Sequence, residues 1–209
     1  MTASRRILRY GEHGILVELD DLNSALGYYA ALDASALPGI RQLVSGARTV
    51  LIDYDPVVVS AGSLKKQLEE LESAEPDAAQ ASEILIPVTY AGADLDEVAR
   101  HHGISTQAVV RAHTEANWTV AFTGFAPGFG YLVAEDWKLA MPRRETPRTV
   151  VPIGSVALAG EFSAVYPQDS PGGWQLIGST AVQMFSPEAE PPALLVPGAR
   201  VRFTIAQAG

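Results

Sequence analysis

The sequence predicts an α+β fold in two units, a small α/β unit followed by a β-rich unit. Strand-like and helix-like runs alternate through the first seventy or so residues, and residues 73–83 then combine Ala, Pro, Gln and acids without periodicity. Beyond Trp118, short runs rich in β-branched and aromatic residues lie between glycine and proline turns. We therefore place the boundary near residue 80, which gives units of residues 1–80 and 81–209.

The composition is that of a folded chain with no attraction to polyanions. Of its 209 residues, 47% are hydrophobic and 19% are charged, so the chain can bury a sizeable core. The formal net charge of −9 argues against binding to nucleic acid or to an anionic membrane surface. There is no cysteine, which excludes disulfides, thiolate metal sites and a cysteine nucleophile.

No export signal or membrane span is expected. Arg9, Glu12 and His13 interrupt the early sequence before an apolar run of signal-peptide length can form. No stretch of about 18 apolar residues occurs anywhere. Together with the lack of cysteine, these features favour a cytoplasmic protein.

In the first unit, residues 14–19 and 49–55 predict strands, because both runs are rich in branched residues and are bounded by turn residues. Between them, apolar residues at helical spacing predict a helix that ends before Pro38. Leucines at helical spacing later predict a second helix with Ser63 as its N-cap. The expected order is strand, helix, strand, helix.

Two short helices are expected early in the second unit. Asp94 is the expected N-cap of the first, Gly103 ends it, and Ser105 caps the second. A helix pair joined by a glycine turn also fits a DNA-binding motif. Because the second helix offers only Arg111 and His113 as donors in an acidic chain, that interpretation is disfavoured.

The rest of the second unit predicts a β-barrel or a β-sandwich, because helical periodicity is absent and turn residues recur at short intervals. The runs that predict strands are residues 84–90, 150–159, 163–167, 174–180, 181–185 and 200–206.

Residues 122–132, FTGFAPGFGYL, combine three phenylalanines and a tyrosine with three glycines. Glycine permits positive φ and close backbone approach, and aromatic rings offer large apolar faces at low entropic cost. The combination predicts the wall of a pocket. Since the segment lacks the lysine and the hydroxyl residue of a P-loop, it is not expected to cradle a triphosphate in that way.

Residues 141–155, MPRRETPRTVVPIGS, concentrate arginines in an acidic half-chain. Arg143, Arg144 and Arg148 lie between prolines, which favour an extended loop. The planar guanidinium fork matches a carboxylate or a phosphate. Anion binding is one interpretation, and a solvated loop whose arginines offset nearby acids is the other.

In residues 166–180, YPQDSPGGWQLIGST, a proline-glycine turn is followed by a tryptophan at the start of a predicted strand. In one interpretation this segment is a second pocket wall, with Trp174 as a platform and Gln175 as a hydrogen-bonding group. In the other it is a hairpin turn with a core tryptophan. The sequence leaves both open.

No complete catalytic or metal-binding motif is present, so the catalytic residues stay unassigned. His113 is a candidate general base, although a histidine at a helix end is more often structural. Asp169 and Glu161 are weaker acid candidates. The four histidines lack the spacing of a metal site, and no metal is predicted.

The three segments resemble the signature stretches of the family called allophanate hydrolase subunit 1, kinase A inhibitor or the B subunit of 5-oxoprolinase. The resemblance covers nearly the whole chain, including PGIRQLVSGARTVLIDYDP and the closing PGARVRF. It implies a ferredoxin-like α/β domain over residues 1–80 and a cyclophilin-like β-barrel domain over residues 81–209.

The resemblance also implies a function shared with partner subunits. The complex would use ATP to open the ring of 5-oxoproline, giving glutamate, ADP and phosphate, and the isolated chain is expected to be inactive. One partner would be a second, related protein of the type called allophanate hydrolase subunit 2 or the C subunit of 5-oxoprolinase, and a third would be of lactam-utilisation type. ATP is implied for the complex, with no metal or biotin on this chain. Urea or allophanate chemistry and inhibition of a sensor histidine kinase remain alternatives.

Carried over by position, the resemblance implies a substrate pocket drawn from all three segments. Its residues are Phe125, Pro127, Gly128, Phe129, Tyr131, Arg143, Arg144, Thr146, Arg148, Gly154, Ser155, Pro171, Gly172, Gly173, Trp174 and Gln175. The chain departs from the family at Gly130, where relatives carry proline, and at residues 161–164, where they carry a Gly-Gln-Thr-Gly run. The second departure bears on the identity of the ligand.

Overall fold

The computed structural model describes residues 5–73 and 83–206, and the chain divides into two compact units, residues 1–80 and 81–209. Each unit contains its own hydrophobic core. The architecture is mixed α/β, with a sheet in each unit and few helices.

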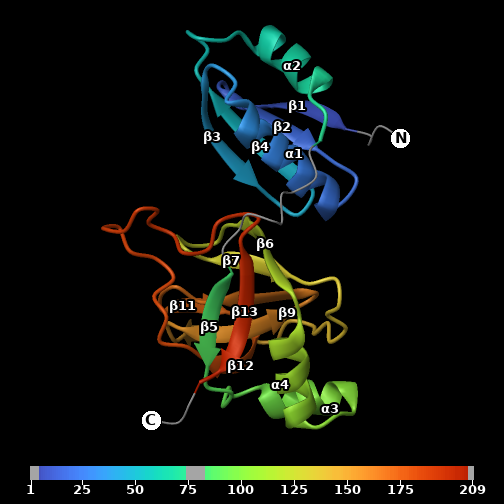
Figure 1. Cartoon of the computed structure of the whole chain (residues 1–209), viewed down its shortest axis with the longest axis vertical. Helices are drawn as coiled ribbons and strands as arrows, with labels where there is room; N and C mark the ends of the chain where they lie inside the picture. The colour runs from blue at the N-terminus through green and yellow to red at the C-terminus, as the bar shows by residue number, and fades with distance from the viewer. Residues whose placement is uncertain (1–4, 74–82, 207–209) are drawn as a thin grey trace. The chain divides into compact units, whose positions relative to one another are not determined.

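The N-terminal unit is an antiparallel sheet with helices on one face (Figure 1). Its elements are β1 Arg6–Tyr10, β2 Gly14–Glu18, α1 Leu22–Ser35, β3 Ile40–Ser45, β4 Thr49–Tyr54 and α2 Ala61–Glu70, and the strand order is β1-β2-β4-β3. Alternate residues of β2 and β4 pack against α1 and α2, as the two-residue period of a strand requires. The Tyr28 hydroxyl donates to the Leu68 carbonyl at 2.8 Å and ties the two helices together.

The predicted strands and helices of this unit correspond to β2, α1, β4 and α2, but β1 and β3 were not predicted. Both lie at the edges of the sheet and are mostly exposed, so they lack the alternation that marks a half-buried strand. The predicted N-cap of α2 was also wrong. Ser60 is the cap, and its Oγ accepts from the Ser63 amide at 3.2 Å.

The C-terminal unit is a nearly closed β-barrel. Its elements are β5 Ile84–Val88, α3 Leu95–His102, α4 Thr106–Glu115, β6 Trp118–Thr123, β7 Gly130–Val133, β8 Arg148–Val151, β9 Ser155–Ala159, β10 Phe162–Val165, β11 Ser170–Gly172, β12 Gln175–Ser179 and β13 Arg200–Ile205. A seven-stranded sheet runs in the order β12-β9-β10-β7-β6-β13-β5, and a bridge between Thr89 and Ser179 joins its two ends. The strands β8 and β11 form a separate two-stranded sheet.

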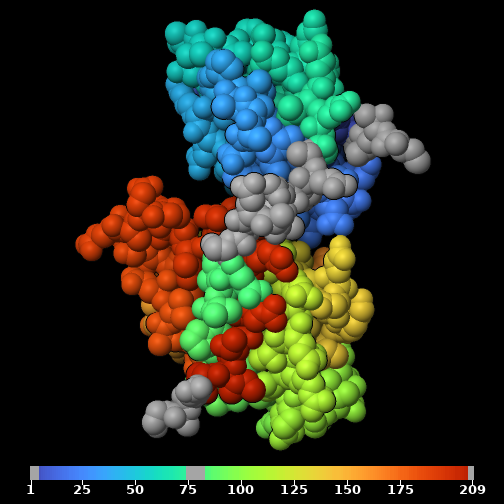
Figure 2. Space-filling model, in the orientation of Figure 1, coloured from blue at the N-terminus to red at the C-terminus, as the bar shows by residue number. Residues whose placement is uncertain are grey.

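The helices α3 and α4 pack against this sheet, α3 on β12 and α4 on β13. Figure 2 shows β13 (red) between β5 (green) and α4 (yellow-green), and β13 pairs with β5 in parallel. Gly103 ends α3 with a left-handed φ of 65°, and the Ser105 Oγ accepts from the Ala108 amide at 3.2 Å, as predicted for both. No helix within the described ranges is long and apolar enough to cross a membrane.

Strand β9 is buried on both sides and separates two packed regions. Val156 and Leu158 point into the main core, whereas Ala157 and Ala159 belong to a second cluster that includes Phe129, Tyr166 and Trp174. Because side chains alternate along a strand, this second cluster covers the opposite face of the sheet. We call it the aromatic cluster.

The predicted runs include β5, β8, β9, β10, β12 and β13, whereas β6, β7 and β11 were not predicted. Two of the predicted runs also need correction. The run 150–159 is not one strand but parts of β8 and β9, separated by a turn at Gly154 with a φ of 78°. A Cβ there would overlap the Thr180 carbonyl oxygen, so the turn requires glycine. Residues 181–185 form no strand, and only an isolated bridge pairs Phe185 with Ala193.

Candidate functional site

The first and third sequence segments meet in the aromatic cluster. The Phe129 ring is edge-on to those of Tyr131, Tyr166 and Trp174, with centroid separations of 5.0, 5.3 and 5.6 Å. Phe129 and Trp174 are buried and Tyr131 is partly exposed. Edge-to-face geometry matches the positive ring edge to the negative ring face, so these rings form a rigid and mostly buried apolar cluster.

Phe125 lies at the margin of the aromatic cluster in a strained conformation. Its φ is 69°, a left-handed value that is uncommon for a residue with a side chain, and 59% of the residue is exposed. The loop is held by hydrogen bonds from the Phe129 amide to the Ala126 carbonyl at 3.0 Å and from the Gly124 amide to the Phe129 carbonyl at 3.2 Å. Strain that holds an aromatic ring in solvent is typical of a binding surface.

The glycine turn of the third segment lets the Tyr166 hydroxyl approach the backbone. A Cβ at Gly172 would overlap the Tyr166 Oη, so any other residue would displace the phenol. Burial raises the pKa of Tyr131 and Tyr166, and the positive charge of Arg143 acts in the opposite direction on both. Both phenols are therefore neutral near pH 7 and can donate hydrogen bonds.

The arginine loop, residues 142–148, is held by a buried carboxylate. The Asp94 Oδ1 accepts from Arg144 Nη1 and from Arg148 Nη2, each at 2.8 Å, and its Oδ2 accepts from the Leu176 amide at 2.7 Å. The Asp94 side chain is only 5% exposed. Asp94 does precede α3 as predicted, but its side chain makes no cap hydrogen bond, because the arginines and Leu176 occupy it.

Arg143 differs from the other two arginines of the loop. Its guanidinium carbon lies 6.0 Å from the centroid of the Trp174 ring, within cation–π range. Among the described residues no carboxylate forms an ion pair with Arg143, whereas Arg144 and Arg148 share Asp94. The three arginines of the loop, together with Asp94 and Glu145, sum to one positive charge. The C-terminal unit as a whole has a negative net charge. The exposed cation beside the aromatic cluster is Arg143.

Several other predicted site residues hold the loops in place. The Ser155 Oγ donates to the Pro152 carbonyl at 2.7 Å, and the buried Gln175 donates from Nε2 to the Pro142 carbonyl at 3.0 Å. Asp169 accepts from the Ile153 amide at 2.7 Å. The Ser155 hydroxyl, the Gln175 amide nitrogen and one Asp169 carboxylate oxygen, which the sequence analysis treated as ligand or acid candidates, therefore bind the backbone of neighbouring loops.

The remaining predicted residues differ in exposure. Pro127, Thr146 and Pro171 are exposed, Gly128 is buried, and Gly173 is partly exposed and accepts from the Arg144 amide at 2.7 Å. Backbone contacts of this kind join the second and third segments into one structure.

His113 lies in the main core, away from solvent. Its Nδ1 is 2.7 Å from the Tyr90 hydroxyl and its Nε2 is 2.9 Å from the Ser163 Oγ. Its ring packs 4.3 Å from that of Phe203 between centroids. Burial lowers its pKa to about 3, so the imidazole is neutral at physiological pH. With both nitrogens occupied inside the core, the geometry favours the structural interpretation of this residue.

No local signal in the sequence indicates the roles of Asp94, Tyr166 and Ser163 in these clusters. Asp94 and Arg148 are 54 positions apart, and His113 and Ser163 are 50 apart. Neither spacing corresponds to a local motif, because only the folded sheet brings the partners together.

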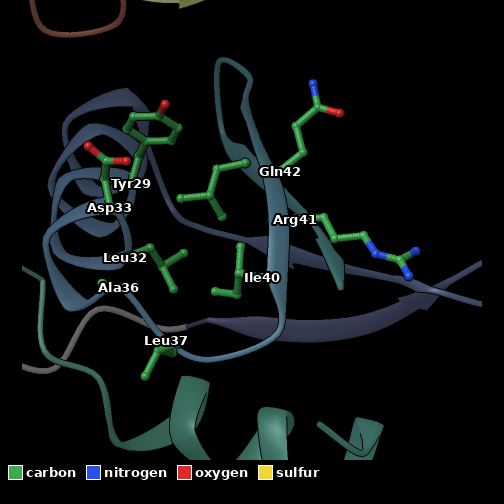
Figure 3. A pocket seen from close by; sticks show the side chains of 9 residues that line it. Tyr29, Leu32, Asp33, Ala36, Leu37, Ile40, Arg41 and Gln42 are labelled. Atoms are coloured by element: carbon green, nitrogen blue, oxygen red, sulfur yellow. The ribbon is translucent and has the colours of Figure 1, made fainter. Parts of the chain in front are cut away.

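Two cavities in the described part of the chain are lined by no residue of the three segments. One of about 370 Å³ lies between α1 and β3 in the N-terminal unit (Figure 3). Leu32 and Ile40 face each other across it, and Arg41 and Gln42 project away from the helix. A second, of about 390 Å³, lies along α4. In the part of the chain that the structure describes, no His, Asp and Glu side chains gather as a metal site.

Comparison with known proteins identifies the family. The family model described as carboxyltransferase domain, subdomain C and D, matches residues 5–195. A protein of Escherichia coli O157:H7 named as the B subunit of 5-oxoprolinase is 41% identical over 172 residues, which cover 80% of this chain and 76% of that protein. The protein of the same name from Bacillus subtilis strain 168 is 34% identical over 217 residues, covering 96% and 88%.

A solved structure shares both sequence and fold. TTHA0988 matches 99% of this chain at 36% identity with a TM-score of 0.77, and the match spans 40% of that longer chain. The chain therefore belongs to the family of carboxyltransferase subdomains C and D, which is also known as the allophanate hydrolase subunit 1 family and includes proteins named as the B subunit of 5-oxoprolinase.

Proposed function

We propose that this chain is a subunit of an ATP-dependent hydrolase that opens the ring of 5-oxoproline, with Arg143 binding the substrate carboxylate or the forming phosphate. The observation that carries the proposal is the Arg143 guanidinium over the Trp174 ring, without an acidic partner in the described ranges. The names of the relatives from E. coli and B. subtilis support the choice of reaction.

The chemistry of the candidate site suits a small cyclic amide with a carboxylate. The exposed Phe125 ring and the partly exposed Tyr131 ring at the edge of the aromatic cluster offer apolar contact. The neutral Tyr131 phenol offers a hydrogen bond, and the exposed Arg143 offers a cation. An amide carbonyl is a poor electrophile, and transfer of a phosphoryl group from ATP to its oxygen creates a good leaving group. A nearby cation would offset the charge that develops. ATP is then a substrate of the complex, and no metal or biotin is assigned to this chain.

The two units fit the domains that the family resemblance implies. An antiparallel sheet in the order β1-β2-β4-β3 with two helices on one face supports a ferredoxin-like domain, in which the N-terminal strand fills one edge. The nearly closed barrel with α3 and α4 against it supports a cyclophilin-like domain. We assign these folds to residues 1–80 and 81–209.

We further propose that the chain works in the cytoplasm beside the two partner subunits and is inactive alone. The relatives are named as subunits, and TTHA0988 is a longer chain. The N-terminal sheet has an apolar row on the face that is opposite the helices. Leu8 pairs with Leu16, Leu16 with Leu51, and Leu51 with Val44, and the two end residues are 37% and 40% exposed. Such a row supports contact with another subunit.

Reconstitution tests this proposal. The chain is co-expressed with a C-type 5-oxoprolinase partner and one of the lactam-utilisation type, and ATP hydrolysis is measured with 5-oxoproline, urea and allophanate. We expect stimulation by 5-oxoproline only in the complete complex, and co-elution of this chain with the C-type partner. If urea or allophanate stimulates ATP hydrolysis and 5-oxoproline does not, the complex acts on urea or allophanate. Robust turnover by the purified chain alone would contradict the subunit role.

A further inference from the structure

The arginine loop contains two kinds of arginine, and we infer that Asp94 is a positioning residue that holds Arg143 over Trp174. The inference rests on the proposed function, because it assumes that Arg143 meets the ligand. It separates Arg144 and Arg148, which bind Asp94, from Arg143, which has no acidic partner in the described parts of the chain.

Asp94 joins segments that are far apart in the sequence. It lies at the entry to α3, yet one oxygen accepts from two arginines of the loop and the other from the Leu176 amide on β12. Its side chain is 5% exposed, against 36% for Arg144 and 21% for Arg148. A buried carboxylate with three donors is a fixed point, since charge-assisted hydrogen bonds are short and directional.

The two neighbours of Arg143 are fixed to the residues on either side of Trp174, Gly173 and Gln175. The Pro142 carbonyl accepts from Gln175 Nε2 at 3.0 Å, and the Arg144 amide donates to the Gly173 carbonyl at 2.7 Å. The Arg144 side chain then reaches Asp94. Arg143 is therefore held between two anchored residues, and its guanidinium projects over the ring.

In this arrangement Arg144 and Arg148 hold the loop in place and need not contact the ligand. Their forks bind a carboxylate of the protein, and Arg148 adds a long contact from Nη1 to the Trp174 carbonyl at 3.5 Å. A change at either arginine would act on the ligand through the position of the loop. Loss of Asp94 would free both guanidinium groups and loosen the segment on either side of Arg143.

The first test measures the loop and does not depend on activity. Asp94→Asn keeps the size of the side chain and removes its charge. In hydrogen exchange of the full chain, we expect at least tenfold faster exchange at the Arg144 and Leu176 amides, with the rest of the barrel unchanged. Asp96→Asn, a change at an exposed acid of α3, is the matched control and should leave both amides protected. If Asp94→Asn does not fold, Arg148→Lys tests the same contact, because lysine keeps the charge and loses the fork.

The second test uses the reconstituted complex with 5-oxoproline. Asp94→Asn should raise KM about tenfold, the scale of one charge-assisted hydrogen bond, with kcat within about twofold of wild type. Adding Arg143→Ala to Asp94→Asn should raise KM little beyond either single change, because both act on one contact. A purely structural Asp94 would lower the amount of active complex without shifting KM.

The outcomes separate the inference from the proposed function. Unchanged exchange at both amides overturns the inference, and so does a KM that rises for Arg143→Ala but not for Asp94→Asn. If exchange accelerates while KM stays unchanged for both variants, the proposed ligand site is wrong and the positioning role falls with it.

Discussion

Two buried polar clusters in the C-terminal unit, one around Asp94 and one around His113, differ in whether their buried side chains are charged. Asp94 is surrounded by two guanidinium groups and a backbone amide, so its cluster is charged and paired. His113 lies between a tyrosine and a serine hydroxyl among aromatic rings, so its cluster is neutral. Burying an unpaired charge is costly, and each cluster avoids that cost in a different way.

The comparison indicates which cluster can act on a ligand. The charged cluster opens to solvent through Arg144 and the adjacent Arg143, next to the aromatic cluster. The neutral cluster is enclosed, and burial lowers the pKa of its imidazole to about 3, far from the range of a general base at neutral pH. We therefore expect changes at His113 to affect stability and changes at Arg143 to affect ligand binding.

The largest effect is expected for His113→Ala. The change leaves a cavity and removes a hydrogen-bonding partner from both the Tyr90 and the Ser163 hydroxyls, so the free energy of unfolding should fall by about 3 kcal/mol. Urea denaturation measures this. His101→Ala, at an exposed position on α3, is the control and should change stability by less than about 0.5 kcal/mol. Wild-type stability combined with lost activity would reverse the roles of the two clusters.

A smaller loss is expected for Arg148→Ala. Asp94 would keep Arg144 but lose one charge-assisted hydrogen bond in a mostly buried place, at a cost of about 2 kcal/mol in unfolding free energy. Thermal and urea unfolding of the chain by itself measure the loss. Arg111→Ala, on the surface of α4, provides a comparison at an arginine outside the loop. Equal stability of the two variants would mean that the Asp94 cluster contributes little to the fold.

The neutral cluster also predicts a pH dependence. The pKa of His113 is about 3 in the folded state and ordinarily 6.5, so the unfolded state binds more protons between these values. The stability that His113 contributes is complete above about pH 6.5 and is lost as the pH falls toward 3. Its slope is about 1.4 kcal/mol per pH unit within this window. Urea unfolding at pH 7, 6 and 5 should show a steeper decline for wild type than for His113→Gln. Parallel slopes would show that His113 can be protonated in the folded state.

Local signals in the sequence predicted much of the fold. Gly103 and Ser105 mark helix ends through their own backbone and side-chain chemistry, and β2 and β4 show the alternation of half-buried strands. The edge strands β1 and β3 were missed because most of their residues are exposed and their apolar residues do not show that alternation. Residues 181–185 have strand-like composition but do not extend the sheet, and composition alone cannot report that.

For the candidate site, the sequence indicated the kinds of residue but not their pairing. Aromatic, glycine and arginine content singled out the segments that lie around Trp174. Which arginine is left without a carboxylate depends on Asp94, which only the fold brings to the loop. The same holds for His113, whose burial follows from contacts with Ser163 and Phe203 that are distant in sequence.

The most direct test of this account is steady-state kinetics of Arg143→Ala in the reconstituted complex. We predict a fall in kcat/KM for 5-oxoproline of about tenfold, expressed mainly as a higher KM, because one charge-assisted contact to the ligand is lost. Arg143→Lys should restore part of the activity, since lysine keeps the charge without the fork. Arg111→Ala should leave kcat/KM unchanged. Wild-type kinetics for Arg143→Ala, together with a collapse of kcat for a folded His113→Ala, would contradict the central claim.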